Sequence, residues 1–237
     1  TAIADRFVLN GIPVFMFHRF SSPEDGVSGH DPEYLDKCLQ YLKDHNYHFV
    51  SIEQVINSVK QKQPLPERSI AFTIDDGFLD HATVAAPIFI EHHCPVTIFL
   101  ITGLLDGKLW PWDDKVAYLV NNSEQKKLTI ELNRIENSFL LTDQKQRKKS
   151  INDIQNLLKT LDAEHIDDYL QIISAACKVS LPAQAPSNYR AMTWDLARTL
   201  EQQGVKFAPH TDTHRILSKL DDADSIHEIT HSWQRIK

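Results

Sequence analysis

The chain has 237 residues, of which 42% are hydrophobic and 24% charged, with a formal net charge of -7 at pH 7. This composition is typical of a globular protein with a sizeable core. The negative charge argues against nucleic acid as a partner, because phosphate binding needs a basic surface. No apolar run is long enough for a transmembrane helix, and three cysteines without metal-ligand spacing predict reduced thiols and no disulfide framework. The first residues do not read as a signal peptide and lack an initiator Met, so the compartment stays open.

The first part of the chain alternates short apolar runs with stretches of helical periodicity. The apolar runs predict buried strands at residues 12–17, 47–50, 70–74 and 95–101. The stretches between them predict helices at residues 34–42, 52–60 and 79–92. Asp31 and Ser51 are the expected N-caps of the first two helices. This alternation is typical of a parallel α/β sheet or barrel.

The pattern changes in the middle of the chain. Charged helical stretches and a short hairpin are expected there, at residues 113–121, 128–141, 144–161 and 166–178. The α/β pattern then resumes with a helix, a strand and a final helix, at residues 194–203, 205–208 and 221–237. We therefore expect an α/β unit made of residues 1–109 and 190–237, with residues 110–189 as a mostly helical insertion or lid. Because the insertion leaves after one strand and rejoins before another, we expect it to border the active-site mouth.

Two strands of the expected α/β unit run directly into polar residues. Asp75, Asp76 and Gly77 follow the third strand, and His210 and His214 follow the last. Functional groups of α/β folds collect at the C-terminal ends of parallel strands. One Asp and two His meeting there would form a divalent-metal site with open positions for water and substrate. The second Asp would remain as an acid or base.

Each signal also has a purely structural interpretation. Asp-Gly pairs are common in turns, and a four-residue His spacing is a weak signal in a chain with 12 histidines. His18 follows the first strand and either faces the same cavity or packs inside the fold. Trp110 and Trp112 form either a sugar-stacking platform or a hydrophobic anchor for the insertion. Late acids such as Glu228 are most simply part of a solvated helix face.

These motifs resemble those of the polysaccharide deacetylases, the NodB-homology group of carbohydrate esterases known as family 4. The first family motif, T-F-D-D-G, is matched by residues 73–77, with Ile in place of Phe. The second, H-[ST]-x-x-H, is matched by His210, Thr211 and His214. Residues 13–19 look like the P-V-L-M-Y-H-R opening of many members. The insertion matches no part of the family that we can name.

The resemblance implies a fold, a reaction and a metal. The implied fold is a distorted, incomplete (β/α) barrel, and the implied reaction removes N-acetyl or sometimes O-acetyl groups from an amino-sugar polysaccharide or glycan. One divalent ion, zinc first with cobalt or nickel as alternatives, would be held by Asp76, His210 and His214. Asp75 would be the general base. Thr211, His18 and Trp112 are further candidates for supporting or substrate-binding roles.

The sequence departs from the family in its last part. The later family motifs, one of which carries the general acid, have no match before Lys237. Five core strands are readable, whereas a closed barrel commonly needs about seven or eight. We therefore expect the natural chain to continue past Lys237, and we expect an unpaired edge and an uncovered apolar face beside the strand that leads to His210. Two other functions stay open: a catalytically silent sugar-binding module, and another two-His, one-carboxylate metalloenzyme such as a non-haem iron oxygenase.

Overall fold

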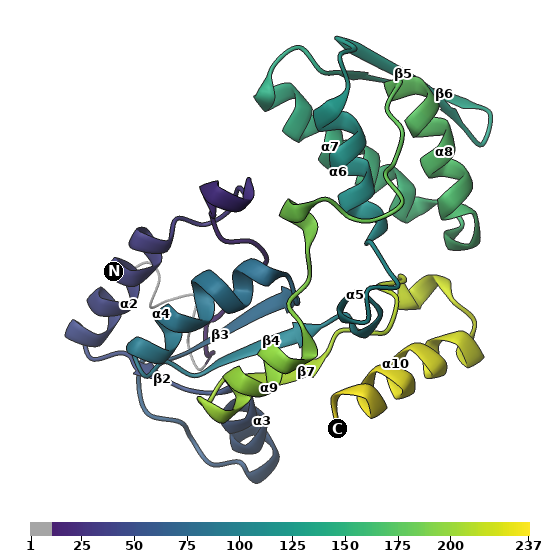
Figure 1. The fold of residues 1–237 in the computed structure, drawn as a ribbon. Coiled ribbons are helices and arrows are strands. Elements are labelled where there is room, and N and C mark those ends of the chain that lie inside the picture. The colour runs from purple at the N-terminus through teal and green to yellow at the C-terminus, as the bar shows by residue number, and fades with distance from the viewer. Residues whose placement is uncertain (1–10) are drawn as a thin grey trace.

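The computed structural model describes residues 11–237; residues 1–10, including the start that lacks signal-peptide features, lie outside the described residues. Figure 1 shows two parts, an α/β unit below and the mostly helical insertion above. The α/β unit contains a five-stranded sheet, and the insertion contains a two-stranded one. No helix within residues 11–237 is long and apolar enough to cross a membrane.

The sheet of the α/β unit is parallel in all of its pairings. The central strand, β3 (Ser69–Asp76), pairs with β1 (Val14–Phe17), β2 (His48–Phe49) and β4 (Val96–Leu100), and β4 in turn pairs with β7 (Lys206–Pro209). All five predicted strands are therefore present. Seven of the eight residues of β3 are buried, so both faces of this strand are covered, as a continuous apolar run in a parallel sheet predicts.

Helices connect these strands, as the sequence predicts. Those of the α/β unit are α2 (Pro32–Asp44), α3 (Ile52–Gln61), α4 (Ala86–Glu91), α5 (Thr102–Leu105), α9 (Trp194–Gln202) and α10 (Asp222–Ile236). Asp31 caps α2 by accepting a hydrogen bond from the Tyr34 backbone, and Ser51 forms a capping box with Gln54 at the start of α3. The helix expected over residues 79–92 is present over residues 79–91, and it contains a π-helical turn, His81–Ala85, that leads into α4.

The insertion packs around a core of its own. It consists of α6 (Trp112–Asn122), β5 (Lys127–Leu132), β6 (Ile135–Leu140), α7 (Gln144–Thr160) and α8 (Ile166–Cys177). Buried apolar side chains of all three helices and of the β5–β6 hairpin form one cluster, separate from the cluster around β3. The hairpin strands pair with each other and with no strand of the parallel sheet within residues 11–237.

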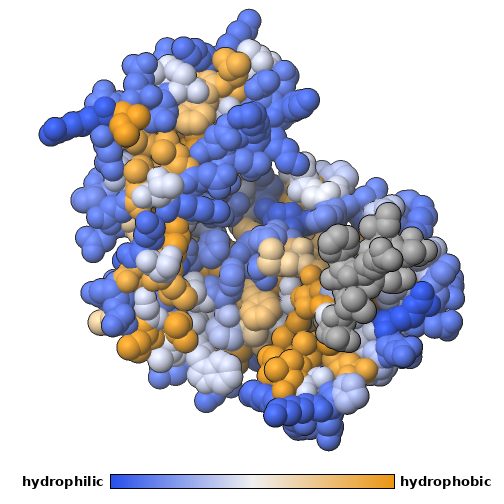
Figure 2. Space-filling view, turned by 180° about the vertical axis from the view of Figure 1, so that it is seen from behind, coloured by the Kyte–Doolittle hydropathy of each residue, from blue (hydrophilic) through white to orange (hydrophobic). Residues whose placement is uncertain are grey.

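The α/β fold class is confirmed, and residues 11–237 form an open sheet, not a closed barrel. Exposed apolar side chains lie on β1, where Phe15 is 50% and Met16 58% exposed, and Phe15 lines a groove of about 640 Å³ between β1 and α2. Figure 2 shows hydrophobic surface on this side of the molecule, next to the grey residues. β7, the strand that leads to His210, pairs only with β4 within residues 11–237, so the expected unpaired edge is present. The amphipathic helix α10 packs against β7, but no residue of β7 is buried, and Ile226, Ile229 and Trp233 of α10 are exposed. The apolar face expected there is therefore covered only in part.

Candidate metal centre

Asp76 lies at the C-terminal end of the central strand β3. Asp76 is the last residue of the strand, and both it and Gly77 have positive φ angles, 91° and 94°, so the chain turns sharply here. A Cβ on Gly77 would lie 2.8 Å from side-chain atoms of Leu100 and Leu105, so the turn needs glycine for space as well as for conformation. Asp76 is buried, while the neighbouring Asp75 is half-buried.

The two histidines lie in a tight loop after β7. The His210 backbone N–H donates to the Leu100 carbonyl at 2.8 Å, which extends the pairing of β7 with β4 by one step. Thr211 and His214 both have positive φ angles, 63° and 59°. The Thr211 hydroxyl accepts a hydrogen bond from the His214 backbone N–H at 3.0 Å and so braces the loop. The four-residue spacing of the histidines thus reflects a loop and not a helix.

The structure brings Asp76, His210 and His214 together. One candidate ligand atom from each lies within 4.8 Å of the others. Asp76 Oδ1 is 3.7 Å from His210 Nε2 and 3.8 Å from His214 Nε2, and it is buried without a hydrogen-bond partner. A buried carboxylate oxygen left unpaired is costly, and a cation between these three atoms would satisfy it. The residues therefore fit a divalent metal with two imidazole ligands and one carboxylate ligand.

The pKa values of the three residues in the metal-free site reflect their burial and the charges close to them. Burial raises the pKa of Asp76 to about 6, against the opposing effect of the neighbouring His214. Burial lowers the pKa of His210. For His214 burial would do the same, but the neighbouring carboxylates, Asp113 first, outweigh it and raise the pKa. Because metal ligands must be deprotonated, cation binding here should release protons.

Asp75, His18 and Trp112 are further predicted site residues outside the three candidate metal ligands. Asp75 precedes Asp76 on β3, and its charge raises the pKa values of both Asp76 and His210. His18 follows β1 and is exposed. Its charge lowers the pKa values of Asp76 and His210. Trp112 is partly buried against the core of the insertion, as the hydrophobic-anchor interpretation predicts.

Sequence reasoning missed two acids near the site. Asp113, at the start of α6, has its Oδ1 3.7 Å from His214 Nδ1. Asp114 follows it, and burial together with the charge of Asp113 raises its pKa well above the usual range. Acids in the first turn of a helix are ordinarily explained by the helix dipole, so no local signal distinguishes this pair.

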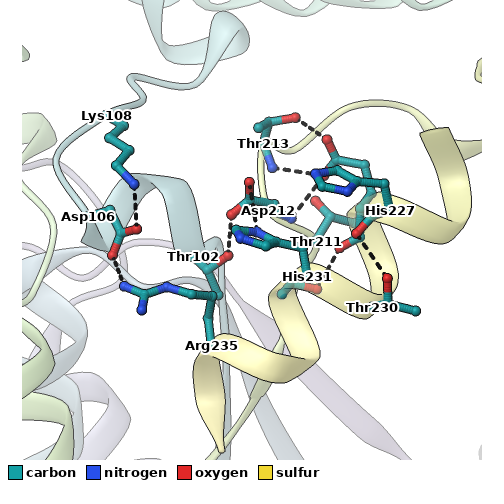
Figure 3. A network of polar contacts seen from close by, with 12 residues as sticks. Thr102, Asp106, Lys108, Thr211, Asp212, Thr213, His227, Thr230, His231 and Arg235 are labelled. Atoms are coloured by element: carbon teal, nitrogen blue, oxygen red, sulfur yellow. Dashed lines mark hydrogen bonds and ion pairs between the residues drawn. The ribbon is translucent and has the colours of Figure 1, made fainter.

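Glu228 on α10 was also misinterpreted, because it is 3% exposed and not part of a solvated face. Its carboxylate accepts hydrogen bonds from the backbone N–H groups of Asp212 and Thr213, between the two histidines. Figure 3 shows that the Asp212 carboxylate is held in turn by the Thr102 hydroxyl and by His231 of α10. Helix α10 therefore supports the loop that carries His210 and His214.

Comparisons with known proteins agree with this architecture. Residues 62–237, more than half of the chain, match the family described as polysaccharide deacetylase. The structure resembles that of PplD, a Streptococcus pyogenes deacetylase in complex with acetate, with a TM-score of 0.53 and 18% identity over 93% of this chain. A de-N-acetylase from Aggregatibacter actinomycetemcomitans gives a TM-score of 0.43 and 19% identity over 85% of this chain.

The likeness to PplD concerns the fold. The chain spans 65% of the length of PplD and 55% of the length of the Aggregatibacter protein. No curated protein sequence shows significant similarity to this chain.

Proposed function

Because the chain belongs to the polysaccharide deacetylase family, we propose that it hydrolyses acetyl groups, N-acetyl groups first, on an amino-sugar polysaccharide or glycan. The observation that carries the proposal is the convergence of Asp76, His210 and His214 at the C-terminal ends of β3 and β7, two parallel strands of one sheet, where Asp75 precedes Asp76. This is the edge of an α/β sheet at which catalytic groups collect.

We assign the metal to Asp76 Oδ1 and to the Nε2 atoms of His210 and His214. Zinc is the first candidate, since two His and one carboxylate with open positions is one of its catalytic ligand sets; cobalt and nickel are the alternatives. When bound, such a cation polarises a carbonyl group and lowers the pKa of water. Asp76 is held in place for this role by the turn through Gly77, and His210 by its backbone bond to Leu100.

Asp75 is the proposed general base. It is adjacent to Asp76 but half-buried, so its carboxylate remains open to solvent and substrate. It would accept a proton from the attacking water as the water oxygen bonds to the acetyl carbonyl carbon. The carbon–nitrogen bond then breaks, acetate leaves, and the sugar amine takes up a proton. We assign no residue to that last transfer.

The test measures acetate and free amine released from oligomers of N-acetylglucosamine. We expect equal amounts of both products, loss of activity after chelation, and recovery when Zn²⁺ is restored. Binding of the oligomer without acetate release, at full metal loading, would favour the sugar-binding module. Activity that requires Fe²⁺ and oxygen would favour an oxygenase, so the assay is repeated in oxygen-free buffer. Acetate released only from O-acetylated sugars would replace the N-acetyl assignment.

A further inference from the structure

The two ring nitrogens of His214 face two different carboxylates. Its Nε2 is 3.8 Å from Asp76 Oδ1, and its Nδ1 is 3.7 Å from Asp113 Oδ1. Asp76 ends a strand of the parallel sheet, whereas Asp113 begins a helix of the insertion. The ring of His214 therefore bridges the two parts of the molecule.

The atoms on the Asp113 side lack other partners. His214 Nδ1 and Asp113 Oδ1 are both buried, and neither has a hydrogen-bond partner within residues 11–237. Buried polar atoms left unpaired are costly, so a partner for both is expected. Hydrogen bonds in empty sites are often long and tighten when the site is filled. A separation of 3.7 Å between a buried donor and a buried acceptor is consistent with such a bond.

We propose that Asp113 is a positioning residue for the metal: it accepts a hydrogen bond from His214 Nδ1 and so holds His214 Nε2 toward Asp76. This inference rests on the proposed metal site. A carboxylate on the far nitrogen of a metal-binding histidine fixes its tautomer and its ring orientation and makes the ligand more basic. Asp113 acts through His214 and needs no contact with substrate.

The insertion holds Asp113 rigidly enough for this role. Asp113 lies in the first turn of α6, and its backbone carbonyl accepts a hydrogen bond from Gln155 Nε2 of α7 at 2.9 Å. The preceding Trp112 packs against the core of the insertion. The N-terminal end of α6 therefore reaches the metal site while its anchor lies in a separate hydrophobic core. This gives the insertion a specific part in building the site.

The experiment measures Co²⁺ affinity by chelator competition, together with the visible absorption spectrum of bound Co²⁺. Asp113→Ala should bind Co²⁺ about 10- to 100-fold more weakly than the unmodified protein, the usual effect of losing such a partner, and should show a changed spectrum. Asp113→Asn keeps an oxygen acceptor but loses the charge. Its Co²⁺ affinity should therefore lie between those of the unmodified protein and Asp113→Ala. Glu124→Gln removes an exposed acid of the same insertion and should change neither quantity.

A double-mutant cycle with His214→Ala separates positioning from a general effect of negative charge. If Asp113 acts through His214, then adding Asp113→Ala to His214→Ala should not weaken the residual Co²⁺ binding further. An equal loss in both backgrounds would overturn the proposal, as would unchanged affinity and spectrum in Asp113→Ala. If Asp113→Ala does not fold, unchanged Co²⁺ binding by Asp113→Asn overturns it. Absence of Co²⁺ binding by the unmodified protein would contradict the metal site itself, and with it this inference.

Discussion

Glu228 accepts a hydrogen bond from the backbone N–H of Thr213 at 2.8 Å, inside the loop that carries both candidate histidine ligands. The same carboxylate oxygen accepts the Asp212 N–H at 2.9 Å, and the other oxygen accepts the Thr213 hydroxyl. One buried side chain of α10 thus satisfies three donors of a loop in which Thr211 and His214 have left-handed backbone conformations. The geometry of the site depends on this helix as well as on the strand ends.

Replacing Glu228 should loosen this loop. We expect Glu228→Ala to lower the free energy of unfolding by about 1–3 kcal/mol, because it leaves partly buried backbone donors unpaired. Glu228→Gln keeps one acceptor oxygen and should lose less. Urea unfolding of the metal-free protein measures the change, and Glu124→Ala, at an exposed site, is the control. A loss in Glu228→Ala no larger than in this control would show that the loop does not need Glu228.

The adjacent acids Asp75 and Asp76 should have separable effects. Asp75→Asn should retain bound metal and fold but lose roughly two to four orders of magnitude in turnover, the usual range for a general base. Asp76→Asn should lose metal affinity first. Metal content and acetate release measured on both variants distinguish the roles. Near-full turnover in Asp75→Asn would mean that the base lies elsewhere.

His81 should make the protein less stable in mild acid. Burial lowers the pKa of His81 to about 4, from an ordinary value of 6.5, and its Nε2 donates to the His18 carbonyl. The unfolded chain binds a proton at His81 more readily than the folded protein does. The contribution of neutral His81 to the free energy of unfolding is therefore complete above pH 6.5 and is lost as the pH falls from 6.5 to 4. The loss from this group is about 2 kcal/mol between pH 7.5 and pH 5.

Urea unfolding at these two pH values tests the role of His81. The decrease in the free energy of unfolding should be smaller in His81→Gln than in the unmodified protein. His165→Gln, at an exposed site, should keep the full decrease. Equal decreases in all three proteins would contradict the assignment.

Arg19 and Asp80 form a largely buried ion pair that ties the end of β1 to the helix after β3. Arg19 Nη2 lies 3.0 Å from Asp80 Oδ1, and the Asp80 side chain is 2% exposed. Arg19→Met should lower the free energy of unfolding by about 3–5 kcal/mol, because it leaves a buried charge unpaired. Asp80→Asn in addition should restore part of that loss. Urea unfolding of both variants measures this, and a double variant no more stable than Arg19→Met would argue against the pair.

Much of the α/β unit could be predicted because its signals are local. Buried parallel strands read as short apolar runs, and the runs at residues 70–74 and 205–208 lead directly into Asp76 and His210. Ser51 caps its helix through hydrogen bonds with Gln54, three positions further along the chain. The position of Asp76 and His210 at the same C-terminal end of the sheet then follows from the parallel pairing of the strands.

The supporting contacts could not be predicted because they join residues distant in the sequence. Glu228 reads as one more acid on an amphipathic helix, and its burial follows only from how α10 packs against β7. Asp113 reads as an ordinary first-turn acid, and its approach to His214 depends on the placement of the whole insertion.

The most direct test of the account is the metal content of the protein at neutral pH. After loading with Zn²⁺ and removal of the excess, elemental analysis should find about one equivalent per chain, as one such ligand set can hold. His214→Ala should lose most of it, whereas Glu124→Gln should keep it. Full retention of the metal by a folded His214→Ala variant would contradict the assignment of Asp76, His210 and His214 as the metal site.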